Sequence, residues 1–194
     1  MIRILDIIFS FFGLLMICPL IILISIIIKL SSPGTIFFIQ KRVGLKSKDI
    51  HVYKFRTMYI GSEKGGFLTV GNNDNRITPI GRILRKFKLD ELPQLFNVLI
   101  GNMSLVGPRP EVRKYVDFYT DNQKKILLLK PGITDWASLK FINENDLLKE
   151  SQDPELYYKK SILPEKIQLG MRYNNSVSEY FKIIFLTIFK VFKN

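Results

Sequence analysis

Cysteine and histidine are nearly absent from this chain of 194 residues. Cys18 is its single cysteine and His51 its single histidine. An intrachain disulfide is therefore impossible, and a zinc site built from cysteine or histidine clusters is excluded. The signature Gly-x-x-x-x-Gly-Lys-Ser/Thr does not occur either, which excludes a P-loop nucleotide site.

Acidic residues are scarce relative to basic ones. The chain has 29 Lys and Arg against 17 Asp and Glu, so its formal net charge is +12. A surface of this kind favours nucleic acid, an anionic membrane face or phosphorylated small molecules as partners. The length suits one domain with at most a small appendage.

Charged side chains are missing altogether from residues 7–28. As a helix, this run would be about 33 Å long, which is enough to cross a bilayer. The pair Cys18-Pro19 lies near its middle, and the proline predicts a kink. The kinked helix could span the membrane, or it could dip into one leaflet and return to the same face. Arg3 before the run and Lys29 after it favour the return, because basic residues prefer the cytoplasmic side.

Two β-prone stretches, Thr35–Val43 and Ile50–Met58, predict a β-hairpin. Its basic side chains suit phosphates or anionic lipid head groups, although a solvated strand pair would carry the same charges. These side chains are Lys41, Arg42, Lys54 and Arg56.

The remaining pattern is mostly helical. Thr78 and Pro79 predict a helix start, followed by an apolar stripe and a basic face. The tail Val177–Phe192 is both apolar and basic, which suits a helix in a membrane interface or a terminal helix packed on the core. Other predicted segments are a loop or flap over Gly61–Asn75 and helices over Glu111–Leu129, Pro154–Ser161 and Pro164–Met171.

Two adjacent carboxylates, Asp90 and Glu91, precede a short apolar helix pattern that ends at Gly101. Asp90 is placed like an N-cap, and a cap is the usual role of such a pair. The same helix end would attract a phosphate. Arg85 lies on the preceding helix, and Arg109 is held between two prolines. Carboxylates and arginines around one phosphate are compatible with transfer through an aspartyl-phosphate.

Five blocks, taken in their order and spacing, resemble the bacterial sugar transferases, a family of small monotopic phosphoglycosyl transferases. The resemblance covers nearly the whole chain. The blocks are Gln40-Lys41-Arg42-Val43-Gly44, Tyr53-Lys54-Phe55-Arg56-Thr57-Met58, Leu89–Val98, Asn102–Pro110 and Lys130-Pro131-Gly132-Ile133-Thr134.

The resemblance implies an enzyme that moves a sugar-1-phosphate from a UDP-sugar to undecaprenyl phosphate, releases UMP and starts the assembly of a glycan. Asp90 would be the nucleophile and would carry a covalent phosphosugar. Glu91 would position the metal or activate the lipid phosphate. Mg²⁺ is the expected cofactor, with Asp90 as its expected ligand. The side chains expected near the substrate phosphates are Arg85, Arg109, Lys54 and Arg56.

The resemblance also implies an α+β fold, mostly helical, with a small hairpin. Residues 1–30 would form a re-entrant membrane helix broken at Cys18-Pro19, where relatives carry Ser-Pro. Residues 31–194 would form the catalytic domain, with amphipathic helices on the cytoplasmic face of the bacterial inner membrane. Its expected partners are the two substrates and membrane lipids, without nucleic acid, and a homodimer is left open.

The block around Trp136 departs from the family pattern. Many relatives carry Gly before the Trp and Gln-Val-Asn-Gly-Arg after it, whereas this chain has Asp135 and then Ser138–Asn143. An arginine that could touch the nucleotide sugar is therefore missing, and no site residue is assigned from this block.

The alternative to an enzyme is a non-enzymatic protein of the membrane surface that binds anionic lipid or nucleic acid through its basic face. The carboxylate pair argues against it, because a pure anion binder gains nothing from acids among its cations.

Overall fold

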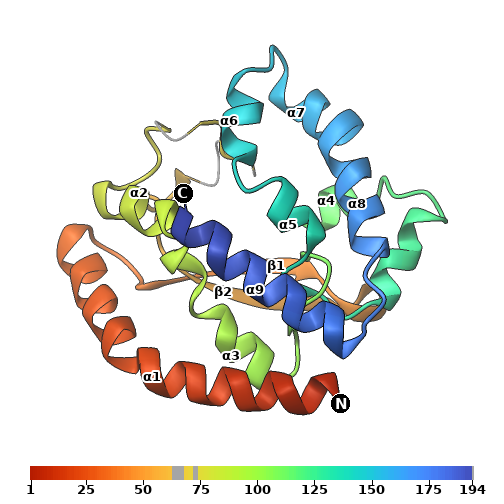
Figure 1. Cartoon of the computed structure of the whole chain (residues 1–194). Helices are drawn as coiled ribbons and strands as arrows, with labels where there is room; N and C mark the ends of the chain where they lie inside the picture. Colours follow the sequence, from red (N-terminus) through yellow and green to blue (C-terminus); the bar gives the residue numbers. More distant parts are fainter. Residues whose placement is uncertain (63–67, 72–73, 194) are drawn as a thin grey trace.

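The computed structural model describes residues 1–62, 68–71 and 74–193, and it confirms a mostly helical α+β protein with a small hairpin (Figure 1). The predicted loop over Gly61–Asn75 falls partly outside the described residues. The predicted start at Thr78 is confirmed, since its hydroxyl accepts a hydrogen bond from the Gly81 N–H at 3.0 Å. The helices are α1 Ile2–Ser31, α2 Pro79–Lys86, α3 Gln94–Leu99, α4 Arg113–Val116, α5 Trp136–Lys140, α6 Glu144–Lys149, α7 Pro154–Tyr157, α8 Leu163–Met171 and α9 Val177–Lys193.

The described residues form two small sheets. Strands β1 (Phe37–Val43) and β2 (Asp49–Phe55) pair antiparallel and confirm the predicted hairpin. Strands β3 (Ser104–Val106) and β4 (Gly132–Thr134) pair in parallel, and the sequence did not predict them. Three residues per strand leave too little pattern to detect, so this pairing depends on tertiary contacts.

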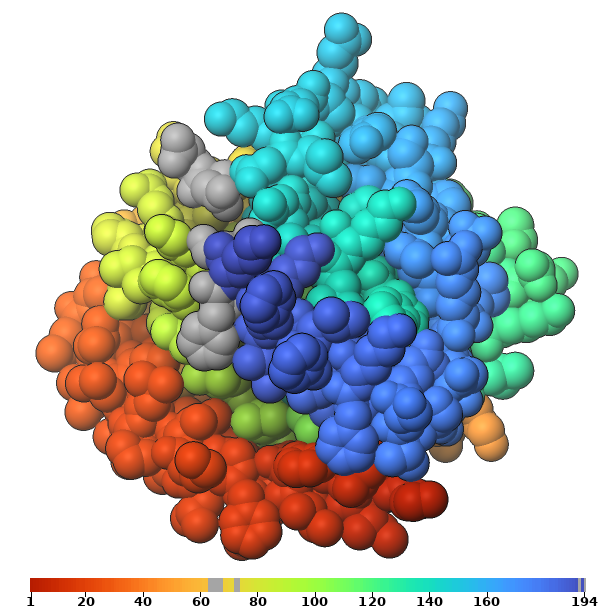
Figure 2. Space-filling model, viewed as in Figure 1, coloured from red at the N-terminus to blue at the C-terminus, as the bar shows by residue number. Residues whose placement is uncertain are grey.

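Helix α1 is long and apolar enough to cross a membrane by length and composition. It contains Pro19, and Figure 1 shows it bent, as predicted for a proline inside a helix. In the space-filling view it forms one whole edge of the molecule (Figure 2). Most of its large apolar side chains are exposed.

The N-terminal turns of α1 are tied to the folded domain by buried polar contacts. Arg3 donates to the Leu99 carbonyl at the end of α3, at 2.8 Å. Asp6 is 1% exposed, and its Oδ1 accepts from three donors at 2.9 to 3.0 Å. Those donors are the Ser104 hydroxyl, the Leu105 N–H and the Tyr180 hydroxyl.

The C-terminal end of α1 is tied to the same domain through Arg56. Its guanidinium donates to the carbonyls of Ile28 at 3.3 Å and Ser32 at 2.8 Å, and also to that of Pro33. These carbonyls lie at the last turn of α1 and just beyond it, where a helix leaves acceptors without internal partners.

Two local predictions are wrong. Asp90 is not the N-cap of α3, since α3 begins only at Gln94 and Asp90 lies in a separate 3₁₀ turn, Leu89–Glu91. The long helix over 111–129 is replaced by the short α4 and the 3₁₀ segment Gln123–Leu128. The two helices predicted over 154–171 are confirmed, and a π-helical segment, Tyr158–Ile162, joins them.

The 111–129 segment breaks because side chains compete with the helical backbone. Thr120 and Gln123 exchange side-chain-to-backbone hydrogen bonds, at 2.9 Å from the Thr120 N–H and 3.3 Å from the Gln123 N–H. Such local bonds satisfy the backbone in a turn and remove the advantage of continuing a helix.

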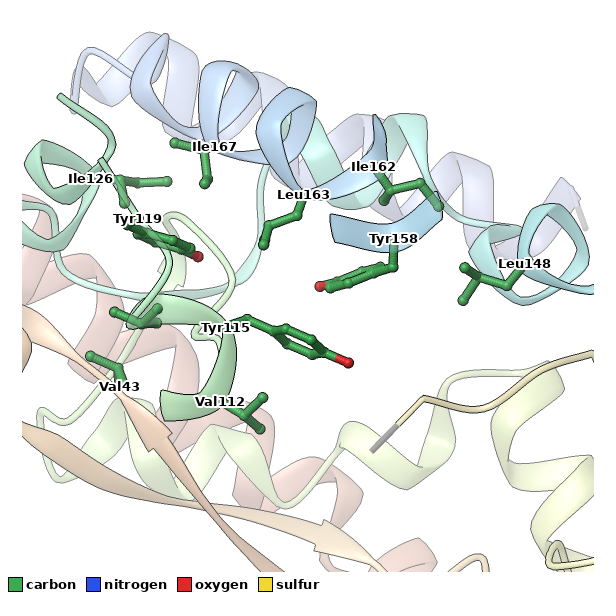
Figure 3. Packing of buried hydrophobic residues seen from close by; sticks show 11 residues of the cluster. Val43, Val112, Tyr115, Tyr119, Ile126, Leu148, Tyr158, Ile162, Leu163 and Ile167 are labelled. Carbon is green, nitrogen blue, oxygen red and sulfur yellow. The ribbon is translucent and has the colours of Figure 1, made fainter. Parts of the chain in front are cut away.

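The largest buried cluster combines three tyrosines with aliphatic side chains (Figure 3). The rings of Tyr115 in α4 and Tyr158 lie 5.0 Å apart between centroids. Aliphatic side chains of α8 and the end of β1 complete it. The cluster fixes the helical segments 113–171 against the hairpin, and so sets one wall of the site described next. Its other buried members are Val43, Val112, Val116, Tyr119, Ile126, Leu148, Ile162, Leu163 and Ile167.

The anchoring of α1 through Asp6 predicts the effect of Asp6→Ala. The substitution leaves three buried donors without an acceptor, and each unsatisfied group costs about 1–3 kcal/mol. We expect a clear loss of thermal stability of the purified protein in detergent. Asp121→Ala, at a pair whose carboxylate side chain is 99% exposed, is the matched control and should change little. Equal melting temperatures for Asp6→Ala and wild type would contradict this role.

Candidate active site

The two carboxylates are presented by a tight turn between α2 and α3. Lys88 has a positive φ of 56°, which turns the chain out of α2 into the 3₁₀ turn that holds Asp90 and Glu91. Asn97 of α3 is fully buried and clamps the hairpin, because its Oδ1 accepts from the Tyr53 N–H at 2.9 Å and its Nδ2 donates to the His51 carbonyl at 2.6 Å. This clamp brings β2 against the turn.

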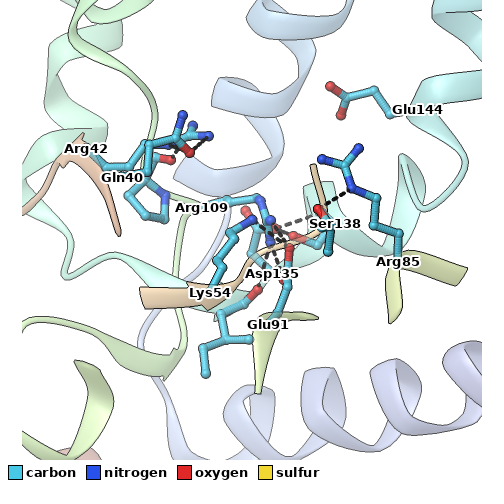
Figure 4. Close-up of polar contacts among 12 residues, drawn as sticks. Gln40, Arg42, Lys54, Arg85, Glu91, Arg109, Asp135, Ser138 and Glu144 are labelled. Carbon is cyan, nitrogen blue, oxygen red and sulfur yellow. Dashed lines mark hydrogen bonds and ion pairs between the residues drawn. The ribbon is translucent and has the colours of Figure 1, made fainter. Parts of the chain in front are cut away.

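Glu91 is the centre of an ion-pair cluster (Figure 4). The Lys54 ammonium donates to its Oε1 at 3.0 Å. The Arg109 guanidinium makes two contacts with it, Nη1 to Oε2 at 2.9 Å and Nη2 to Oε1. This paired geometry matches the fork of an arginine to both oxygens of one carboxylate.

The charges of the cluster shift each other's pKa values. Burial alone would raise the pKa of Glu91, but Arg109 and Lys54 outweigh it and hold that pKa well below its usual range. The charge of Glu91 in turn raises the pKa of Arg109. Burial lowers the pKa of Lys54, although Glu91 opposes this. At neutral pH, Glu91 is ionised and neutralises cations on both sides.

Asp90 lies in a different environment from its neighbour. It is 7% exposed, and its carboxylate accepts no hydrogen bond from any residue that the structure describes. Burial and the charge of Glu91 raise its pKa, against the opposite pull of Lys54 and Arg85. A desolvated carboxylate without donors is available to a substrate.

Arg85 borders Asp90 from α2. Its Nε donates to the Thr57 hydroxyl at 2.9 Å and its Nη1 to the Thr69 hydroxyl at 3.1 Å. Burial lowers its pKa, and the charge of Asp90 opposes that shift. The two threonine hydroxyls fix the orientation of the guanidinium and leave its positive charge unneutralised.

Arg56 does not join this group. The two terminal nitrogens of its guanidinium donate to carbonyls at the end of α1 and to the Ser32 hydroxyl. Its Nε is buried without a partner among the described residues. Arg56 follows the last residue of β2, so the strand alternation that places Lys54 at the carboxylates no longer applies to it. We therefore treat Arg56 as an anchor of α1.

A cavity of about 1470 Å³ opens over these side chains. Its opposite lining includes Ser138, Glu144 and Lys166, from the helical part of the chain, which sequence reasoning did not assign to the site. Asp135 also lines it, is 1% exposed, and caps α5 by accepting from the Ser138 N–H at 2.7 Å. The Asp-x-x-Ser spacing signals such a cap, but nothing local indicates that α5 faces the carboxylates.

The described residues contain no group of three or more metal-ligating side chains. Mg²⁺ nevertheless binds in many sites through one or two carboxylates, with waters and substrate phosphates as further ligands. Asp90, whose oxygens accept no protein donor, fits such a site, whereas Glu91 is already bound to two cations.

Comparison with known proteins identifies the group to which this architecture belongs. Residues 1–194 match the family model described as "Bacterial sugar transferase". The chain belongs to the bacterial sugar transferase family. Its match over the whole sequence confirms the resemblance seen in the five blocks.

Three relatives of known name are longer proteins. A UDP-N-acetylgalactosamine-undecaprenyl-phosphate N-acetylgalactosaminephosphotransferase of Aeromonas hydrophila is 41% identical over 137 residues, which cover 69% of this chain and 32% of the relative. UDP-glucose:undecaprenyl-phosphate glucose-1-phosphate transferases of Escherichia coli K12 and Klebsiella pneumoniae are 37% and 36% identical, over 97% and 99% of this chain. The chain spans 39% and 40% of their lengths.

The opposite environments of the two carboxylates predict opposite effects on stability. Asp90 has a raised pKa, so its ionised form is a cost to the fold at neutral pH, and Asp90→Asn should raise the melting temperature. Glu91→Gln should lower the free energy of unfolding by about 1–3 kcal/mol, because two buried cations lose their partner.

The pH dependence of stability also distinguishes Glu91 from Asp90. The contribution of Glu91 is present above its unfolded pKa and is lost as pH falls through its lower folded pKa, so the deficit of Glu91→Gln should shrink in acid. Unfolding monitored from pH 7 to pH 3 checks both variants, with Asp121→Asn as a surface control. Destabilisation by Asp90→Asn at pH 7 would contradict the account.

Proposed function

We propose that this protein transfers a sugar-1-phosphate from a UDP-sugar to undecaprenyl phosphate and releases UMP. The observation that carries the proposal is the buried carboxylate of Asp90, which lies between cations in a large cavity and has no hydrogen-bond donor among the described residues. The names of the relatives, which use glucose and N-acetylgalactosamine donors, support the same reaction. A basic lipid- or nucleic-acid-binding protein would have no use for this arrangement.

The first step is attack by a carboxylate oxygen of Asp90 on the β-phosphorus of the donor. The bond from that phosphorus to the oxygen shared with the α-phosphorus breaks, and UMP leaves with that oxygen. Asp90 then carries an acyl phosphate whose phosphate group is esterified to the sugar. Burial favours the attack, because a desolvated carboxylate is less stabilised as an anion. Arg85, Lys54 and Arg109 would stabilise the charge of the diphosphate.

The second step returns the enzyme to its starting state. A phosphate oxygen of undecaprenyl phosphate attacks the same phosphorus, the acyl phosphate bond breaks, and the carboxylate of Asp90 is restored. The product is undecaprenyl diphosphate carrying the sugar. Mg²⁺ bound beside Asp90 would supply neutralising charge for the diphosphate.

We assign Glu91 a positioning role. Its two oxygens hold Arg109 in a fixed plane and keep Lys54 within 3.0 Å. A guanidinium held in advance loses little freedom when a phosphate arrives. Because Glu91 neutralises Arg109 and Lys54, these cations do not form a close ion pair with Asp90.

The anchoring of α1 supports a re-entrant membrane helix. Arg3 and Asp6 bind its first turns to the domain, and Arg56 binds its last turn to the same domain. A bilayer core is about 30 Å thick, so a helix with both ends held on one folded body returns to the face it left. The bend at Pro19 lets residues 1–30 do so. The domain 31–194 would then lie on the cytoplasmic face of the inner membrane.

Helix α9 offers a second membrane contact. Phe185, Ile188 and Phe189 are 70%, 53% and 60% exposed, which is unusual for three large apolar side chains on one helix of a soluble protein. Lysines follow in its last turn. This combination suits a helix lying in the interface.

UMP release tests the proposed reaction. Wild-type protein, undecaprenyl phosphate and Mg²⁺ are mixed with UDP-glucose, UDP-galactose or their N-acetylated forms. One or more donors should release UMP, and Asp90→Asn should reduce the rate by on the order of 10³-fold or more. Asp121→Asn should match wild type. Undiminished release by Asp90→Asn would exclude Asp90 as the nucleophile.

Labelling of single cysteines tests the membrane arrangement. With Cys18 replaced by Ser, cysteines introduced at Met1 and at Lys193 should both resist a membrane-impermeant maleimide added to intact cells, and both should react after lysis. Labelling of residue 1 from outside would show that α1 spans the membrane.

A further inference from the structure

The catalytic cavity is larger than a diphosphate requires. The cations assigned to phosphate lie together with the carboxylates, whereas α5, α6 and α8 contribute a separate stretch of lining with Ser138, Asn143, Glu144 and Lys166. In Figure 4 the Glu144 side chain lies beyond Arg85, apart from the cluster around Glu91. This wall has no role in the reaction described above.

Glu144 and Lys166 form a mostly buried ion pair in that wall. The Lys166 ammonium contacts Oε2 of Glu144, and their side chains are only 18% and 22% exposed. The second carboxylate oxygen, Oε1, accepts no hydrogen bond from any residue within the described ranges. An acceptor and an ammonium with spare donors therefore border the same cavity.

The ion pair lines the same cavity as Arg109. The charge of Glu144 contributes to raising the pKa of Arg109. A carboxylate near a phosphate site would repel the substrate, but Lys166 neutralises it. A neutral group is thus bound more readily there than a further phosphate.

From this geometry we propose that Glu144, held by Lys166, binds hydroxyl groups of the donor sugar and contributes to sugar choice. The proposal rests on the proposed function, in which the sugar is attached to the β-phosphate beside Arg109. A sugar hydroxyl both donates and accepts, so one hydroxyl can donate to Oε1 while a neighbour accepts from the ammonium. Sites of this type reject an epimer strongly, since it leaves buried polar groups unpaired.

The competing explanation is an ion pair that only joins helices. The chain offers a matched control for it in Lys140–Glu165, which joins α5 to α8. Those side chains are 53% and 40% exposed, and neither borders the wall of the catalytic cavity. Glu165→Gln removes a helix-joining carboxylate without touching the cavity.

The test compares Glu144→Gln, Glu165→Gln and wild type with UDP-glucose, UDP-galactose, UDP-N-acetylglucosamine and UDP-N-acetylgalactosamine. We expect Glu144→Gln to lower kcat/KM for the preferred donor about tenfold. The ratio of kcat/KM for that donor to kcat/KM for its 4-epimer should decrease as well. Inhibition by UDP, which lacks a sugar, should be unchanged. Glu165→Gln should leave kcat/KM for the preferred donor and the donor ratio at their wild-type values.

The outcomes separate this proposal from the proposed function. An unchanged donor ratio in Glu144→Gln, or an equal loss for all donors and for UDP, would overturn the subsite. If wild type releases no UMP from any donor, the proposed reaction fails, and binding of the same four donors, measured by thermal shift, then decides the subsite. If wild type binds the four donors with different affinities and Glu144→Gln removes these differences, the subsite is supported. Equal binding of all four donors by wild type would overturn it.

Discussion

The contact between Glu91 and two cations is the interaction on which the site depends. Arg109 comes from a proline-bounded loop and Lys54 from a hairpin, and both converge on one carboxylate. Because Glu91 takes these charges, the adjacent Asp90 can remain buried beside cations without a hydrogen-bonded partner. Two neighbouring residues of the same acidic character thus acquire opposite pKa shifts. Their environments, rather than their chemistry, are the basis of the proposed roles of nucleophile and positioning group.

Helix α1 and the site share one structural support. Helix α1 packs against α3, which begins three residues after Glu91. Arg3 closes the C-terminal end of that same short helix. The turn that presents Asp90 is therefore held between the hairpin and α1. With α1 in the membrane as proposed, the chemistry would take place close to the lipid surface where its acceptor would lie.

Local features were predictable from the sequence, because their causes lie within a few residues. The hydroxyl of Thr78, the positive φ at Gly101 and the alternating hairpin strands follow local rules. The convergence of Asp90 and Glu91 with Arg85, Arg109 and Lys54 was expected from the family resemblance, and the structure brings these five together.

What was missed depends on distant contacts. Arg56 caps a helix that ends more than twenty residues earlier in the chain, and the β3–β4 pairing joins three-residue strands that carry no pattern of their own. Glu144 reaches the cavity only because the buried cluster around Tyr115 fixes the later helices against the hairpin. The break within 111–129 results from side-chain hydrogen bonds that a periodicity argument does not count.

Trapping of the covalent intermediate tests the central claim most directly. The protein is incubated with a turned-over UDP-sugar and Mg²⁺ without undecaprenyl phosphate, quenched, and analysed by intact mass and peptide mapping. The account predicts an added sugar-phosphate mass on the peptide that contains Asp90, absent from Asp90→Asn and discharged when undecaprenyl phosphate is added before quenching. A single UMP-releasing turnover without any adduct, or an adduct on another residue, would contradict it.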